Sequence, residues 1–162
     1  MKMPEDKIGK VMGRVEYVAF NEENEIIYEH KHDFPKEHNT VCDLYYDFLA
    51  DHSAGGSDAI ISDCHCGTGS GQAAADTNLD VPCPEDRTNV DSIAQGAAAN
   101  SHIVTVITTF PAGTCTASLE ECGLFPSDLS NTADMFLYDE SLSFAKGALD
   151  TLVVTWTITH SN

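Results

Sequence analysis

Cys64, His65 and Cys66 are consecutive residues with metal-binding side chains, and Cys83 follows seventeen residues after Cys66. Thiolates and imidazoles are common ligands of tetrahedral Zn²⁺. The spacing is unfavourable, because neighbouring side chains of a strand point to opposite faces and structural zinc sites usually separate paired cysteines by at least two residues. We therefore predict no metal or other cofactor, and these four residues are the candidate ligands if a metal is bound.

Three further cysteines, Cys42, Cys115 and Cys122, bring the total to six. In a reducing cytoplasm thiols stay free and behave as small apolar side chains, whereas a particle released from the cell could oxidise them. Cys115 and Cys122 flank a predicted turn and could form a disulfide if their Cα atoms lie within about 7 Å. The sequence leaves both states open.

Other polar motifs are weaker. The segment 67–71 reads Gly-Thr-Gly-Ser-Gly but lacks the Gly-Lys-Ser/Thr ending of a phosphate-binding loop, so we interpret it as a surface turn. His30 and His32 share one face of a strand, as a metal-binding or pH-sensing pair would, but solvated side chains are the simpler interpretation. Acidic loop residues could bind Ca²⁺, although the EF-hand order is absent; they are Asp76, Asp80, Glu85 and Asp86.

No catalytic constellation stands out in the sequence. The chain has no nucleophile-elbow motif and no cysteine-protease signature. No two carboxylates are distinguished as the pair that glycoside hydrolysis requires. We predict that the protein is not an enzyme.

The charge of the chain is strongly acidic and unevenly distributed. Residues 1–36 carry six basic and eight acidic side chains, whereas residues 37–162 carry two basic and eighteen acidic ones, and the total is −18. Such a surface repels nucleic acid and anionic membranes. We expect the nearly neutral residues 1–36 to provide much of the contact with a partner, with residues 1–8 as a docking arm. No apolar segment is long enough for a signal peptide or a membrane span.

The elements that would position these residues are mostly strands. Alternating apolar residues predict strands over 9–20, 102–110 and 152–160, and a polar turn at 21–25 predicts a hairpin with a strand at 26–28. Shorter strands are expected at 58–62, 88–95, 135–138 and 142–144, a turn at 120–125 and a surface loop at 67–86. Helical spacing predicts one short helix over 40–51. The predicted core contains Val15, Tyr17, Ile103, Val106, Leu152, Val154, Trp156 and Ile158.

Many short strands with one short helix indicate an all-β fold, either a β-sandwich or a jelly-roll. The sequence contains no internal repeat and no composition shift typical of a linker. We therefore expect residues 1–162 to form a single β-sandwich domain.

Three segments between residues 60 and 160 form a recognisable pattern. They are Gly67-Thr68-Gly69, the segment 121–125 (Glu-Cys-Gly-Leu-Phe), and the segment 146–158 with the spacing Lys-x-x-x-Asp-Thr-Leu-x-Val-x-Trp-x-Ile. In order and spacing they resemble a group of tailed-phage structural proteins described as virion, tail-fibre or decoration proteins. The cysteines near the glycine loop and the first 55 residues have no counterpart in this pattern. The resemblance implies a β-rich virion subunit without catalytic residues.

Compact size and an acidic surface favour a capsid decoration or cement protein, which would bind the assembled shell and stabilise it by mass action. The expected partners are copies of the chain itself, for example in a trimer, and virion proteins such as the major capsid protein. A collar, neck or tail-fibre subunit is the alternative, and a small metal- or carbohydrate-binding protein is a more distant one. We expect assembly in the host cytoplasm and location in the virion, with no nucleic-acid or membrane partner.

Overall fold

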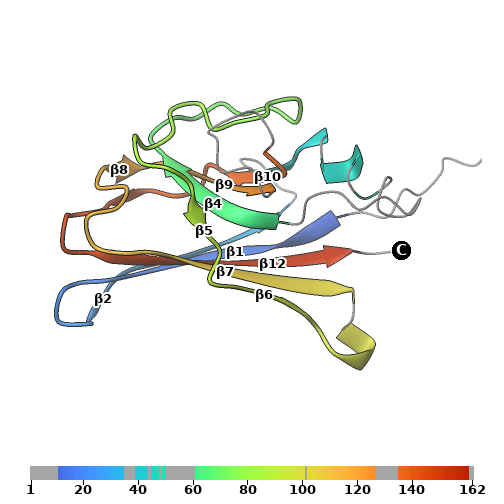
Figure 1. Cartoon of the computed structure of the whole chain (residues 1–162), viewed down its shortest axis with the longest axis horizontal. Helices are drawn as coiled ribbons and strands as arrows, with labels where there is room; N and C mark the ends of the chain where they lie inside the picture. Colours follow the sequence, from blue (N-terminus) through green and yellow to red (C-terminus); the bar gives the residue numbers. More distant parts are fainter. Residues whose placement is uncertain are drawn as a thin grey trace, which may run out of the picture.

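We describe the protein from a computed structural model, which places residues 11–34, 39–43, 45–47, 49, 61–100, 102–126 and 135–160. These residues form two five-stranded sheets and a small two-stranded sheet. Figure 1 shows the two large sheets as stacked layers. The predicted all-β sandwich is therefore confirmed. No helix in this part of the chain is long and apolar enough to cross a membrane.

The first sheet has the strand order β2-β1-β12-β7-β6 and is antiparallel throughout. Its central pair, β1 and β12, is in register along its whole length. Alternate side chains of both strands are buried, as the periodicity predicts. The bounds are β1 Val11–Phe20, β2 Ile26–Phe34, β6 Ser92–Gln95, β7 Ile103–Phe110 and β12 Thr151–His160.

The second sheet has the order β3-β10-β9-β4-β5, and a short sheet pairs β11 with β8. The central strand β9 is buried at every residue. The bounds are β3 Asn39–Val41, β4 Ile61–Gly67, β5 Thr88–Asn89, β8 Ser118–Leu119, β9 Glu121–Pro126, β10 Leu137–Asp139 and β11 Phe144–Ala145, with one 3-10 turn, η1, at Ala98–Asn100.

The inner faces of the two sheets enclose one apolar core. Trp156 is fully buried there and packs edge-on against Phe34, with ring centroids 6.0 Å apart. Ile103 was predicted to be a core residue, but it is only partly buried. It lies opposite Thr159 in the sheet, and both side chains face outward. The other predicted core residues are all fully buried: Val15, Tyr17, Val106, Leu152, Val154, Trp156 and Ile158.

Six predicted elements need correction. The strands expected at 135–138 and 142–144 are β10 at Leu137–Asp139 and β11 at Phe144–Ala145. The turn expected at 120–125 is the strand β9, and the strand expected at 58–62 is β4, which begins at residue 61. Residues 58–60 lie outside the described residues. The stretch 88–95 contains two strands, β5 and β6, which belong to different sheets. Of the helix expected over residues 40–51, residues 43, 45–47 and 49 are helical. Residues 40 and 41 belong instead to the strand β3.

The surface loop was expected over residues 67–86, but Gly67 is the last residue of β4. The remaining segment, 68–86, forms no strand and is not entirely on the surface. Leu79 and Cys83 are buried, and Leu79 joins a second apolar cluster with Phe125 and Tyr138. Figure 1 shows the segment arching over the second sheet. It therefore covers this sheet, and the site described below lies where it ends.

Candidate functional site

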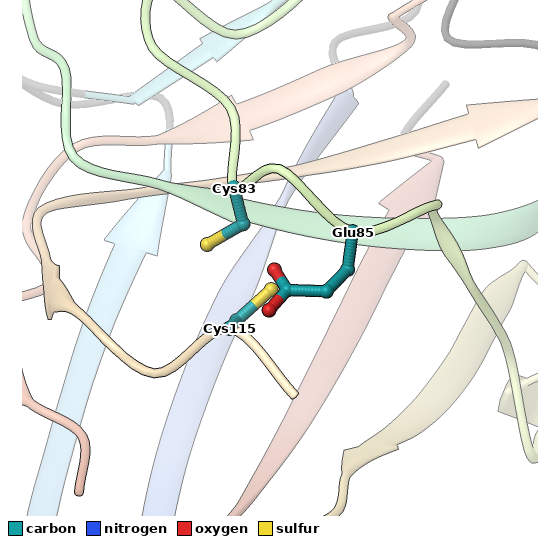
Figure 2. Close-up of side chains that lie close together, drawn as sticks. All are labelled: Cys83, Glu85 and Cys115. Atoms are coloured by element: carbon teal, nitrogen blue, oxygen red, sulfur yellow. The ribbon is translucent and has the colours of Figure 1, made fainter. Parts of the chain in front are cut away.

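Among the described residues, one group of metal-binding side chains converges, and it consists of Cys83, Glu85 and Cys115. We call these three residues the thiol–carboxylate cluster. Their ligand atoms, two Sγ and one carboxylate oxygen, all lie within 4.8 Å of one another. Figure 2 shows the Cys115 sulfur beside the Glu85 carboxylate, with the Cys83 sulfur close to both. Cys83 is 5% exposed and Cys115 is 0% exposed, so the thiols are shielded from solvent.

Two segments that are distant in the sequence build this cluster. Cys83 is held beside β4 by a hydrogen bond from its backbone N–H to the carbonyl of Cys66, at 2.9 Å. Pro82 and Pro84 flank it and restrict the local backbone. Cys115 lies in the turn after β7 with a φ of 48°, a left-handed conformation that is uncommon outside glycine. Such backbone strain is often found where side-chain placement matters for function.

The imidazole of His65 on β4 lies near the cluster and is a third type of metal-binding group, besides the thiols and the carboxylate. It is 0% exposed, and neither ring nitrogen makes a hydrogen bond of normal geometry. The hydrogen bond with Cys83 and burial raise the pKa of the Cys115 thiol, and His65 is close enough to oppose that rise. Buried polar groups without partners are rare and costly, so this ring is the least satisfied side chain beside the cluster.

The predicted candidate ligands do not converge on one point, although Cys64, Cys66 and Cys83 all belong to the inter-sheet core cluster. Cys64 Sγ lies 3.5 Å from Cys122 Sγ in that cluster. Cys83 groups with Cys115 of the same cluster and with Glu85, two residues that the sequence did not bring together with it. All six cysteines are free and buried. Cys122 contacts Cys64, and Cys115 is placed beside Cys83, so the suggested disulfide between Cys115 and Cys122 is not formed.

The thiols differ in acidity. The hydrogen bond from Cys115 lowers the pKa of Cys83, whereas burial raises the pKa of Cys66 and of Cys42 to about 12. In reduced protein prepared with a chelator, we expect iodoacetamide at pH 8 to label Cys83 before any other cysteine, because the thiolate is the reactive form. Peptide mass mapping against time would measure the order of labelling. Earlier modification of Cys42 or Cys66 would contradict the prediction.

A second polar group centres on the carboxylate of Glu121 in β9, which is 0% exposed. Its Oε1 accepts hydrogen bonds from the backbone N–H of Gly69 (3.0 Å) and Val81 (2.8 Å). Its Oε2 accepts from Asp80 N (3.0 Å) and Gln72 Nε2 (3.0 Å). The glycine loop thus binds a carboxylate of its own chain, and the backbone donor of Gly69 that a phosphate would use is occupied.

A third polar group joins the two sheets. The fully buried Asp139 accepts hydrogen bonds from Tyr17 Oη and from Ser141 Oγ (2.8 Å), and it also contacts His32 Nδ1 (3.1 Å). Ser141 Oγ lies 3.2 Å from His30 Nε2. In a catalytic triad the histidine lies between the acid and the serine. Here the acid binds the serine directly, which differs from the triad order, and the group ties strand β2 to β10.

His30 and His32 were predicted to be solvated. They are half-buried instead, because they lie on the inward side of β2 and contact Ser141 and Asp139. In the described part of the chain, the four acidic residues considered for Ca²⁺ form no group of three or more metal-binding side chains with one another. Asp76 and Asp80 line the same depression of the 68–86 segment, and Asp76 accepts a hydrogen bond from the N–H of Ala73.

The outward side chains of β7 and β12, two adjacent strands of the first sheet, carry no charge. Nine outward residues of β7 and β12, which we call the threonine face, are uncharged and partly exposed: Ile103, Thr105, Ile107, Thr109, Thr151, Val153, Thr155, Thr157 and Thr159. On the neighbouring strands the outward charges are paired, with Arg14 Nε 2.7 Å from Asp33 and Lys31 Nζ 3.1 Å from Glu16.

The two basic residues after residue 36, Arg87 and Lys146, are both buried. The guanidinium of Arg87 stacks 3.7 Å above the centre of the Phe125 ring. Lys146 Nζ donates to the carbonyls of Pro111 (3.0 Å) and Asp150 (2.6 Å). Neither charge offsets the acidic groups on the surface.

Comparison of the chain with protein-family models, with curated proteins and with solved structures found no match in any of the three.

Proposed function

We propose that the protein is a non-enzymatic structural subunit of a tailed-phage virion, and that it decorates and stabilises the assembled capsid shell. The observation that carries the proposal is the threonine face. Two adjacent strands without an outward charge stand out in a chain with a formal charge of −18. Surfaces depleted of charge at their centre and surrounded by polar groups are typical of protein interfaces.

The charge distribution suggests the orientation of such a subunit. The outward side chains of β1 and β2 contain two bases and three acids, close to neutrality, so this sheet can approach another protein without strong repulsion. The acidic remainder would face solvent, away from packaged DNA. Residues 1–8, the expected docking arm, lie outside the described residues.

The partners that fit this proposal are the major capsid protein and further copies of the chain, located in the virion. Binding to the assembled lattice alone would stabilise that lattice by mass action. The segments that resemble phage virion proteins are the reason for proposing this class of function; they include the end of β4 at Gly67 and the strand β12 with Trp156.

The experiment that tests the proposal is the copy number of the chain in purified particles, measured by quantitative mass spectrometry against the major capsid protein. A count in the hundreds, in a simple ratio to the capsid protein, supports decoration. A count between a few and a few dozen supports a collar, neck or tail-fibre subunit instead. Absence from the particle overturns the virion proposal.

We expect Thr105→Arg to weaken binding to particles that lack the chain by more than about tenfold, because its cross-strand neighbours, Thr157 and Ala94, are uncharged and the new charge would be buried without a partner. Stability should change by less than about 0.5 kcal/mol, since Thr105 is partly exposed. Co-sedimentation with the particles measures the binding. Thr68→Arg adds the same charge at an exposed position of the 68–86 segment and should bind normally. Equal binding by the two variants would exclude the threonine face as the interface.

A further inference from the structure

We propose that the thiol–carboxylate cluster, together with His65, is a binding site for a zinc-class divalent cation. This inference does not depend on the proposed virion role. It begins from the convergence of Cys83, Glu85 and Cys115, whose ligand atoms lie within 4.8 Å of one another (Figure 2). In a tetrahedral site with Zn–S bonds of about 2.3 Å, two sulfurs are about 3.8 Å apart, so only a small adjustment is required.

His65 provides the independent observation that a ligand is missing. The ring is completely buried, neither nitrogen makes a hydrogen bond of normal geometry, and the Cys115 thiol is close enough to interact with it. Glu85 Oε2 is buried and has no partner either. A single cation bound by the three clustered side chains would satisfy the carboxylate, and His65 beside Cys115 would provide the fourth ligand.

The donor set defines the class of cation. Two sulfurs, one nitrogen and one oxygen suit Zn²⁺ and its close analogue Co²⁺, whereas Ca²⁺ and Mg²⁺ require oxygen ligands. On binding, each thiol releases its proton to solvent, and two S–H bonds are replaced by two metal–sulfur bonds without oxidation or reduction. With neutral His65 and ionised Glu85, the loaded site carries one negative charge.

The surroundings are suited to this charge. Lys146 is 3% exposed and lies near enough to Cys115 for that thiol to act on the pKa of the ammonium, which burial lowers. Its hydrogen bonds to the carbonyls of Pro111 and Asp150 hold it beside the turn that carries Cys115. A fixed cation next to thiolate ligands is an outer partner of the kind that stabilises metal sites.

The site also has a structural consequence. Cys83 and Glu85 belong to the segment that leads into β5 of the second sheet, while Cys115 follows β7 of the first. A cation bound by both would cross-link the two layers at one edge of the sandwich. The role predicted for it is therefore structural, because four protein ligands leave no open position for a substrate.

The test uses the full-length chain, reduced with a phosphine and freed of metal, and the probes are Co²⁺ and Zn²⁺ alone. We expect one equivalent of Co²⁺ to produce the thiolate-to-metal charge-transfer band and the visible bands of a tetrahedral site, and Zn²⁺ to displace it. Zn²⁺ should also raise the melting temperature, since it binds the folded state. Folded protein without a charge-transfer band would overturn the proposal.

Variants identify the ligands. Cys83→Ser and Cys115→Ser should abolish the charge-transfer band or weaken Zn²⁺ binding by more than about tenfold. Removing a residue that only supports a metal ligand already costs about tenfold in affinity, so removing a ligand itself should cost more. Cys42→Ser is the matched control, because it changes a fully buried cysteine of the other apolar cluster. Glu85→Gln should weaken binding and Asp86→Asn, its exposed neighbour, should not. Unchanged binding in the Cys83 and Cys115 variants would place the cation elsewhere and overturn the proposal.

His65→Phe keeps a buried ring and removes both nitrogens. We expect it to weaken Zn²⁺ binding and to alter the visible Co²⁺ bands while leaving the charge-transfer band, which comes from the sulfurs. If reduced protein binds no metal and oxidised protein loses two hydrogens through a Cys83–Cys115 disulfide, the pair is a redox element and the metal proposal is wrong.

Discussion

Trp156→Ala is expected to lower the free energy of unfolding by about 3–5 kcal/mol, the usual cost of removing a large aromatic side chain from a core. The indole is 0% exposed and packs against Phe34 from the neighbouring hairpin. Natural domains are stable by only about 5–15 kcal/mol, so the variant should be largely unfolded under mild denaturing conditions. Urea titration followed by circular dichroism would measure the change.

Tyr46→Ala is a suitable control for this experiment, because Tyr46 is an aromatic residue that is 37% exposed. Its replacement should change stability much less than the loss of Trp156. Trp156→Phe, which retains a ring in the core, should fall between the two. An alanine variant at position 156 with an unchanged urea midpoint would contradict the assignment of this strand to the core.

Glu121→Ala should cost about 3 kcal/mol, because it leaves three backbone donors of the 68–86 segment without their acceptor. These donors are the N–H groups of Gly69, Asp80 and Val81. The chain approaches the carboxylate very closely, since a Cβ added to Gly67 would lie 2.4 Å from Glu121 Oε1. The effect should therefore be concentrated in the segment that the carboxylate holds.

Hydrogen exchange distinguishes a local effect from a global one. In Glu121→Ala the amides of Gly69, Asp80 and Val81 should lose their protection, while those at the centre of β12 keep most of theirs. Glu120→Ala removes the same charge from the exposed neighbouring residue and should leave all of these amides protected. If both variants exchange alike, the net charge of the chain and not the buried carboxylate controls this segment.

The strands that could be predicted are those with one face in the core and the other toward solvent. β1, β7 and β12 have this character, so their apolar residues alternate. β9 has no such alternation, because both of its faces are covered and every residue is buried. Without that pattern, Gly123 favours a turn in the sequence, although it lies within a central strand.

The candidate site could be predicted only in part. Cys83 and His65 stand out as metal-binding types near each other in the sequence, but rules of ligand spacing apply to residues of one loop or hairpin. Cys115 reaches Cys83 from a different layer of the sandwich, and Glu85 looks like one acid among many. The role of the Glu121 carboxylate could not be predicted either, because its hydrogen-bond donors lie about 40 residues away or more along the chain.

The burial of Arg87 and Lys146 affects how the folded protein withstands digestive enzymes. Proteases of the trypsin type cut after lysine or arginine and need several residues of accessible, extended chain around the cut. From residue 37 to residue 162 these are the two basic residues, and they are 4% and 3% exposed. The folded sandwich therefore presents such a protease with no accessible cleavage site over this whole length, a useful property for any protein that has to persist outside a cell.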